Sequence, residues 1–140
     1  MTAEILCVGS LKERYWRDAV AEYTKRLSGY CRTQIREVPD ERTPEGGMSD
    51  RERSAVLARE GDRLRRLMGE SRTGTHRIAL CIGGRRYSSE EWATHLSSLM
   101  GSGTSHLQFV IGGSLGLDEA LVRETDEQMS FSDFTFPHQM

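Results

Sequence analysis

The chain has 140 residues, of which 36% are hydrophobic and 29% charged, and its net charge is −2. This length suits one domain, and no apolar run reaches the ~20 residues that a membrane-spanning helix needs. The stretch from Met1 to Cys7 lacks the basic start and apolar run of a secretory signal peptide. We therefore expect a single domain over residues 1–140, in the cytoplasm and not in a membrane.

The first half of the chain predicts two strands and two helices. Residues 4–8 and 33–38 are short runs typical of strands, and between them residues 12–27 carry apolar side chains at the spacing of one helix face. The second helix begins after Ser49, which forms a capping box with Glu52 and so satisfies free backbone N–H groups. Gly69 is a plausible end for this helix.

The second half repeats the alternation. Residues 77–82 form an apolar strand that Gly83-Gly84 follows, and Ser88 then opens a helix that Gly101 to Gly103 ends. Further along, we expect a buried strand over 107–111, a short helix capped by Asp118 and a last short strand over 129–131.

This order of elements indicates an α/β fold. Strands and helices alternate, and the strands at 77–82 and 107–111 have no polar face, which is typical of a parallel sheet with helices on both faces. Ligands bind beyond the carboxyl ends of the strands in such sheets. Those ends are Gly83-Gly84, Gly112-Gly113 and the loop 131–137, so we expect them to form three walls of one cleft.

The glycine turns alone do not identify a ligand. Gly112 to Gly116 match neither a P-loop nor a dinucleotide-binding fingerprint, and paired glycines after a strand are more often tight turns than binding loops. The neighbouring loop adds aromatic rings that can stack on a planar group, with the hydroxyls of Ser132 and Thr135 as hydrogen-bonding groups. From these residues alone, a flavodoxin-like domain that binds a small ligand is one hypothesis.

Cysteines and charges add two expectations. The three cysteines show no Cys-x-x-Cys or Cys/His ligand spacing, so we expect no metal site, and we interpret Cys7 and Cys81 as small buried hydrophobes. Residues 51–86 hold ten arginines against four acidic residues. This excess favours an anionic partner, although a solvated helix face explains it equally well.

Four segments of the sequence resemble one known family. They are Ile5–Trp16, Glu37–Glu41, Val110–Ser114 and Ser130–Met140. They are similar to the RlmH-type ribosomal RNA large subunit methyltransferases, which are small enzymes of the SPOUT class. The resemblance implies a parallel-sheet α/β fold with a trefoil knot and a homodimer. It also implies S-adenosylmethionine as methyl donor, and methylation of N3 of a pseudouridine in 23S ribosomal RNA on the assembled ribosome.

The resemblance also implies site residues. It places the cofactor-binding contacts on Leu80, Gly112, Phe131, Ser132, Asp133, Phe134, Thr135 and Phe136. These residues belong to the walls that the strand ends predict. His138 is a weak candidate for a catalytic group, and holding the loop is the more common role for such a residue. Arg85 and Arg86, together with the arginines of the 51–66 helix, are candidates for contacts with RNA phosphates.

In the family, a further helix follows the segment that corresponds to Ser130–Met140, completing the knot and much of the dimer contact. For a domain that ends at Met140 we therefore expect weak cofactor binding, an incomplete knot and a less stable dimer. Calorimetric titration with S-adenosylmethionine tests this, since micromolar binding would contradict it. An alternative function is a ribosome-binding or RNA-binding module without catalysis.

Overall fold

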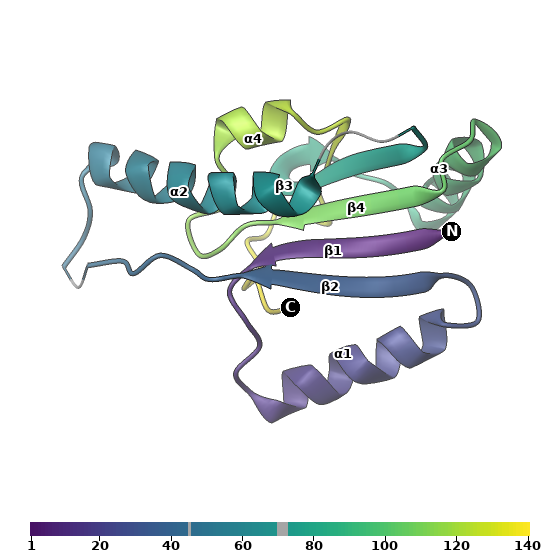
Figure 1. The fold of residues 1–140 in the computed structure, drawn as a ribbon, viewed down its shortest axis with the longest axis horizontal. Helices are drawn as coiled ribbons and strands as arrows, with labels where there is room; N and C mark the ends of the chain where they lie inside the picture. The colour runs from purple at the N-terminus through teal and green to yellow at the C-terminus, as the bar shows by residue number, and fades with distance from the viewer. Residues whose placement is uncertain (45, 70–72) are drawn as a thin grey trace.

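A computed structural model describes residues 1–44, 46–69 and 73–140, and it contains one sheet with four helices in these ranges (Figure 1). The elements in chain order are β1 (Thr2–Val8), α1 (Arg14–Leu27), β2 (Arg32–Val38), α2 (Asp50–Met68), β3 (Thr75–Arg85), α3 (Ser89–Gly101), β4 (His106–Ile111), α4 (Glu119–Arg123) and β5 (Glu127–Met129). The five strands lie in the order β2-β1-β4-β3-β5, and every neighbouring pair is parallel. The predicted α/β fold with a parallel sheet is confirmed.

One face of the sheet carries the main core. Successive side chains of a strand point to opposite faces, so Leu6 and Val8 of β1 lie on the same face as Val110 of β4, to which β1 is paired. These side chains pack with Leu64 of α2 and Leu121 of α4, and all five are almost fully buried. Helices α2 and α4 therefore cover this face.

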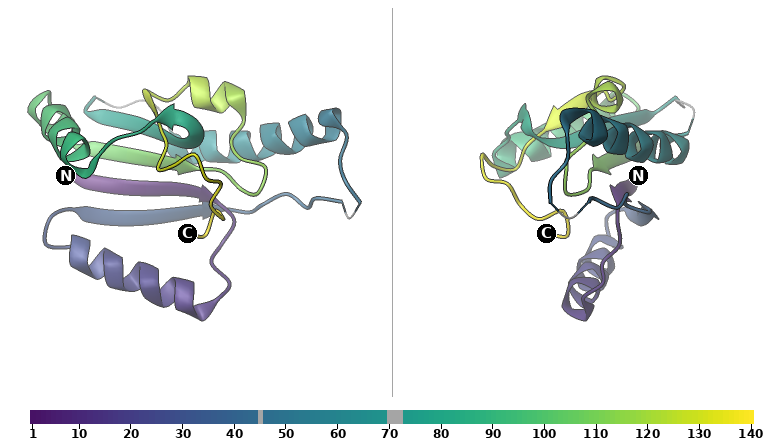
Figure 2. Two further views of the ribbon diagram at one scale, coloured as in Figure 1. Left: turned by 180° about the vertical axis from the view of Figure 1, so that it is seen from behind. Right: turned by 90° about the vertical axis from the view of Figure 1, so that its left-hand side faces the viewer.

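Helix α3 covers part of the other face. Its Trp92 packs edge-on against Phe109 of β4, with ring centroids 6.3 Å apart. Helix α1 is different, because it stands away from the sheet beside the edge strand β2 and buries no residue (Figure 2). No helix in the described residues is long and apolar enough to cross a membrane.

Both predicted capping boxes are present. Ser49 and Ser88 accept hydrogen bonds from the backbone N–H groups of Glu52 and Glu91, whose carboxylates in turn accept from the backbone N–H groups of the two serines. The expected cap at Asp118 is wrong, since its side chain makes no capping bond and pairs instead with Arg65 of α2. Helix α4 therefore begins without a side-chain cap.

The second correction concerns the end of β3. The sequence predicts that this strand stops before Gly83-Gly84, but it runs to Arg85 with an irregular register between Leu80 and Arg85. A Cβ atom at Gly84 would lie 2.5 Å from the backbone of Met129 in β5. The glycine therefore allows two backbones to approach within the irregular segment between Leu80 and Arg85, both of which pair with Met129. The last strand is also displaced by two residues, from the expected 129–131 to Glu127–Met129.

Candidate functional site

The residues predicted to bind a cofactor gather at the carboxyl edge of the sheet. Leu80 of β3 is paired with Ile111 of β4, and Gly112 follows Ile111 directly. Leu80 is also paired with Met129 of β5, after which the chain continues through Ser130 into the loop 131–136. The register therefore brings Leu80, Gly112 and the start of this loop to one edge.

The turn after β4 is closed by its own backbone. The N–H group of Gly116 donates to the carbonyl oxygen of Gly113 at 3.0 Å, and a Cβ atom at Gly112 would collide with the carbonyl of Gly116. The close backbone approach that the sequence indicates at Gly112 is thus made to the chain itself. A residue with a Cβ atom in place of Gly112 would force the turn open.

The loop after β5 presents its aromatic rings to solvent. Phe131, Phe134 and Phe136 are exposed, and the exposed fraction of Phe134 reaches 78%. The predicted ligand-binding hydroxyl of Ser132 accepts a hydrogen bond from the N–H of Phe134 at 3.1 Å. The loop is therefore partly held by its own hydrogen bonds, while its rings have room for a partner.

The loop is anchored at both ends. The backbone N–H of Ser130 donates to the carbonyl of Arg85 at 2.9 Å, and the guanidinium of Arg86 pairs with the carboxylate of Asp133 at 2.6 Å. Further along, His138 lies over the turn after β1, with its Nε2 atom 3.5 Å from where a Cβ of Gly9 would be. The segment after β5 thus returns to the carboxyl end of β1, and the position of His138 there suits a role in holding this segment.

The arginines predicted to contact RNA are only partly available. Arg85 lies over the ring of Tyr87 at 4.5 Å from its centroid, and Arg86 is paired with Asp133. In α2, Arg59 and Arg63 pair with Glu41. Arg65 of the same helix pairs with Asp62, Asp118 and Glu124. Much of the arginine excess in this helix therefore serves internal ion pairs, and Arg72 lies outside the described residues.

Two of the three cysteines, Cys7 and Cys81, lack the properties of reactive thiols, and both are partly rather than fully buried. Burial, together with the nearby carboxylate of Glu37, raises the pKa of Cys7 to about 11, and burial also raises the pKa of Cys81. A thiolate is the nucleophilic form of cysteine, so neither residue is activated near neutral pH.

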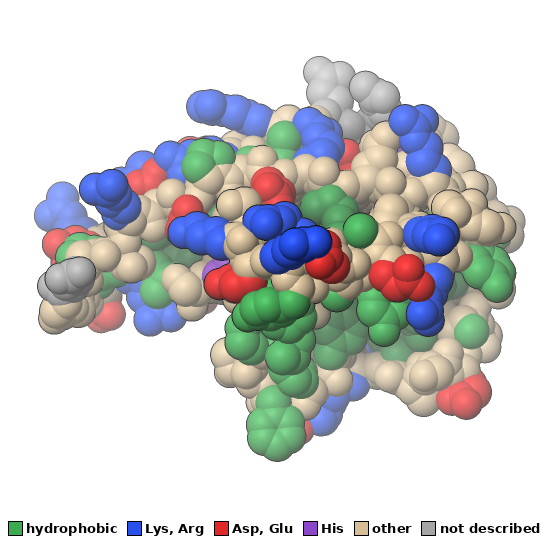
Figure 3. Space-filling view, turned by 90° about the horizontal axis from the view of Figure 1, so that it is seen from below, with side chains coloured by type: hydrophobic (Ala, Val, Ile, Leu, Met, Phe, Trp, Pro, Cys, Tyr) green, Lys and Arg blue, Asp and Glu red, His purple; other side chains and the backbone are tan. Residues whose placement is uncertain are grey.

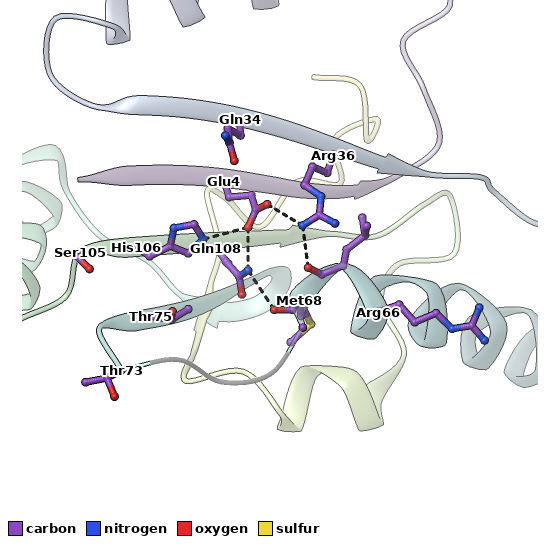
Figure 4. A pocket seen from close by; sticks show the side chains of 12 residues that line it. Glu4, Gln34, Arg36, Arg66, Met68, Thr73, Thr75, Ser105, His106 and Gln108 are labelled. Atoms are coloured by element: carbon purple, nitrogen blue, oxygen red, sulfur yellow. Dashed lines mark hydrogen bonds and ion pairs between the residues drawn. The ribbon is translucent and has the colours of Figure 1, made fainter.

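A polar network that the sequence did not predict lies on the covered face, towards the amino ends of the strands (Figure 4). The carboxylate of Glu4, in a residue only 4% exposed, accepts hydrogen bonds from Arg36 at 3.1 Å and Gln108 at 2.8 Å, and lies 3.1 Å from Nε2 of His106. Burial opposes ionisation of Glu4, but these partners outweigh it and lower its pKa. The only sequence signal was a polar residue at each of two core positions, Glu4 and Gln108.

The network joins the sheet to the end of α2. Arg36 donates to the carbonyl of Leu67 at 3.1 Å, and Gln108 donates to the carbonyl of Met68 at 3.3 Å. Beside these contacts is a hollow of 540 Å³, and a second hollow of 470 Å³ lies between α3 and the end of β3. Neither hollow includes the predicted cofactor residues, so the candidate cofactor site is the open carboxyl edge.

The chemistry of this edge fits S-adenosylmethionine. Leu80 and the three phenylalanines offer apolar and aromatic surface for a flat base, and the loop 131–136 also carries the carboxylate of Asp133. The exposure of the three rings shows that they are not already packed against the chain. These residues are suited to hold a small ligand with one planar group.

A five-stranded parallel sheet covered by helices defines the α/β class of folds, and comparison with known proteins identifies the family. The family described as "Predicted SPOUT methyltransferase" matches residues 1–140, so the chain belongs to the SPOUT methyltransferases. It is 46% identical to the ribosomal RNA large subunit methyltransferase H of Bifidobacterium adolescentis and 44% identical to that of Limosilactobacillus reuteri. It is also 46% identical to that of Listeria welshimeri. Each similarity covers 100% of this chain and 86% of the relative.

Proposed function

We propose that this methyltransferase uses S-adenosylmethionine to methylate N3 of a pseudouridine in 23S ribosomal RNA, on the assembled ribosome and in the cytoplasm. The observation that carries the proposal is the similarity, over the whole chain, to relatives named ribosomal RNA large subunit methyltransferase H. The gathering of Leu80, Gly112 and the loop 131–136 at one edge supports it, because the reaction needs a place for the methyl donor beside an open surface for RNA.

The chain's own contribution is mainly to hold and align the reactants. S-adenosylmethionine supplies a methyl group that is already activated by its positive sulfur. Leu80, the Gly112 turn and the loop 131–136 would hold that cofactor and direct the methyl group towards the attacking nitrogen. The proton on N3 must also leave, which a general base assists. His138 is a weak candidate for that base, and its position over Gly9 favours the role of holding the loop.

Arg85 and Arg86 are the proposed contacts for RNA phosphates. Both lie where β3 ends, next to the loop 131–136. Arg86 would exchange its exposed partner Asp133 for a phosphate, at little cost because exposed ion pairs contribute little stability. Few such contacts give weak binding to free RNA, which suits a preassembled ribosomal surface as the substrate.

We further infer that the chain works as a homodimer. Apolar side chains gather on the face where α1 lies (Figure 3). The exposed apolar residues of this region include Tyr15, Tyr23 and Leu27 of α1 and Ile35 of β2. A second copy would cover these side chains, since clustered exposed apolar residues often mark protein–protein contacts.

Methyl transfer to ribosomes tests the proposal. Ribosomes from a bacterial strain that lacks its own methyltransferase of this type are incubated with the chain and labelled S-adenosylmethionine, and the 23S RNA is digested and analysed for N3-methylated pseudouridine. Binding to ribosomes without methyl incorporation would favour the alternative of a catalytically inactive RNA-binding module. A flavin or nucleotide that copurifies with the chain would favour the flavodoxin-like alternative.

Alanine variants of two exposed apolar residues, Phe134 and Met100, distinguish loss of a site contact from a general effect of removing an apolar side chain. Phe134→Ala removes a ring that is 78% exposed, so we expect the fold to persist and methyl transfer to fall by at least tenfold, about 1.4 kcal/mol of lost positioning. Met100→Ala removes an apolar side chain that is 52% exposed at the end of α3, away from the carboxyl edge. Equal activity of the two variants would remove Phe134 from the site.

A further inference from the structure

Three side chains from three separate elements meet between α3 and the far edge of the sheet. The Nε2 atoms of His76 on β3 and His95 on α3 lie 3.0 Å and 2.7 Å from the same carboxylate oxygen, Oε2 of Glu127 on β5. One ligand atom from each residue lies within 4.8 Å of the others, and within the described parts of the chain no other group of three or more His, Cys, Asp or Glu residues does so. The side chains are 19%, 27% and 12% exposed.

Neighbouring groups orient this His76–His95–Glu127 cluster. The hydroxyl of Tyr87 donates to the second carboxylate oxygen of Glu127 at 2.6 Å. The ring of Tyr87 stacks on that of His95, with centroids 5.3 Å apart and planes 17° apart, and His76 meets His95 edge-on. Hydrogen bonds of this kind hold metal-binding side chains in place. The three ligand atoms are thus directed towards one another by their surroundings.

We propose that His76, His95 and Glu127 bind a single divalent transition-metal ion of the zinc class. Two imidazole nitrogens and one carboxylate oxygen are ligands that Zn²⁺ accepts, whereas Mg²⁺ and Ca²⁺ prefer oxygen alone. Ligand atoms around tetrahedral zinc are about 3.3 Å apart for bonds of about 2.0 Å. The carboxylate oxygen lies 3.0 Å and 2.7 Å from the two imidazole nitrogens, and all three atoms lie within 4.8 Å of one another, so adjustments of the carboxylate and of both imidazoles would bring them around one ion. The ion would replace the protons that the imidazoles now share with Glu127.

A fourth ligand can come from solvent. His95 and Tyr87 line the hollow of 470 Å³ beside α3, which gives water access to the cluster. The cluster begins at the second residue of β3 and the first residue of β5, so it lies towards the opposite end of the strands from the proposed cofactor edge. A bound ion would join α3 to two strands at the edge of the sheet. This metal site would be separate from the proposed methyl transfer.

The Glu4 network offers a matched contrast. His106 Nε2 lies 3.1 Å from the carboxylate of Glu4, with a side-chain exposure of 31% that is close to the 27% of His95. However, Glu4 has a single histidine, and Arg36 and Gln108 already donate to its oxygens. A guanidinium beside the carboxylate repels a cation, so this second histidine–glutamate pair is not expected to bind metal.

The sequence predicts no metal site, because it has no Cys-x-x-Cys or Cys/His pair at the short spacing typical of metal ligands. Here Glu127 lies 51 residues from His76 and 32 residues from His95, and only the pairing of β3 with β5 and the packing of α3 bring them together. The cluster is the observation against that prediction.

Titration of the metal-free 140-residue chain with Zn²⁺ tests the proposal. We expect one ion per chain at micromolar Zn²⁺ or below, and Co²⁺ substitution should give the visible absorption of a four-coordinate site. The His76→Ala, His95→Ala double variant should lose this binding, while His106→Ala keeps it. Tyr87→Phe retains the stacked ring and removes only the hydroxyl, so it should weaken Zn²⁺ binding by roughly 10–100-fold.

Each outcome bears on the proposal. Absence of stoichiometric Zn²⁺ binding by the unmodified chain would overturn it and leave a hydrogen-bonded cluster. Unchanged affinity in the double variant, with its fold verified by circular dichroism, would assign the ion to other groups and overturn it equally. If the double variant does not fold, Tyr87→Phe decides, because unchanged affinity in that variant contradicts the orientation on which the proposal depends.

Discussion

Helices α1 and α2 have similar sequence patterns and different surroundings. Both carry apolar side chains at helical spacing with charged residues between them. Helix α2 buries five residues, including Leu64 and Met68 in the main core, whereas α1 buries none. The spacing of apolar residues therefore predicts a helix with an apolar face, but it does not predict whether other elements of the chain pack against that face.

Local contacts stabilise α1 in place of a core. Arg17 donates to the carbonyl of Lys12 at 2.7 Å near the start of the helix, and the pairs Arg14–Asp18 and Arg26–Glu22 lie along its surface. Such pairs contribute only about 0.3–0.5 kcal/mol each, and short isolated helices are marginal in water. The apolar face of α1 is therefore suited to a partner, while that of α2 is already used.

The largest expected effect is in the covered helix. Leu64→Ala should lower the free energy of unfolding by about 2–5 kcal/mol, because Leu64 is 1% exposed and its removal leaves a cavity against Leu6 and Val110. Chemical denaturation followed by circular dichroism measures the change. Leu27→Ala in α1, where the leucine is 43% exposed, is the matched control and should cost much less. Similar losses in the two variants would contradict the difference between the helices.

The next effect concerns the polar network that ties α2 to the sheet. Glu4→Gln should lower the free energy of unfolding at pH 7 by about 1–3 kcal/mol, since Arg36 loses its charged acceptor. The pKa of Glu4 is lowered in the folded chain despite burial, because Gln108, Arg36 and His106 favour the carboxylate. The contribution of Glu4 to the free energy of unfolding is therefore complete above the ordinary carboxyl pKa of about 4.3. It is lost as the pH falls through the pKa that Glu4 has in the folded chain, which is lower.

A pH series of denaturation curves checks this sign. The difference between the original chain and Glu4→Gln should be constant from pH 7 to about pH 5 and shrink at lower pH, as the carboxyl becomes protonated in both states. A matched variant on the uncovered helix is Glu22→Gln, which removes the exposed pair with Arg26 and should change stability by less than about 0.5 kcal/mol. A difference for Glu4→Gln that grows towards acid pH would contradict the assignment.

The sequence predicts the local features of this fold well. The order of strands and helices and both capping boxes follow from residues that are near one another in the chain. Asp118 fails as a cap because Arg65, 53 residues away, pairs with its carboxylate. The end of β3 differs from the prediction because the backbone of β5 lies against Gly84 and pairs with Arg85 beyond it. These errors arise where tertiary contacts replace a local preference.

The same distinction applies to the candidate site. The exposed aromatic loop Phe131–Phe136 could be predicted because its residues are adjacent in sequence, and its role in cofactor binding stays a prediction. The Glu4 network and the His76–His95–Glu127 cluster could not be predicted in this way. Each side chain that contacts the central carboxylate, of Glu4 or of Glu127, is at least 32 residues away from it in the sequence. Strand register and helix packing determine these clusters, and neither is visible in a single sequence.

The smallest expected effect on unfolding is in the uncovered helix, and there the useful measurement is association. Tyr23 is 65% exposed, so Tyr23→Ala should change the free energy of unfolding of the isolated chain by less than about 0.5 kcal/mol. If a second copy covers α1, the same substitution should raise the dissociation constant of the dimer by roughly fivefold or more, as expected for an interface tyrosine. Lys25→Ala, two positions along and so on a different face of the helix, should leave that constant nearly unchanged. Sedimentation at several protein concentrations measures the dissociation constants of the two variants. Equal constants for Tyr23→Ala and the original chain would show that the apolar face of α1 serves some contact other than the dimer.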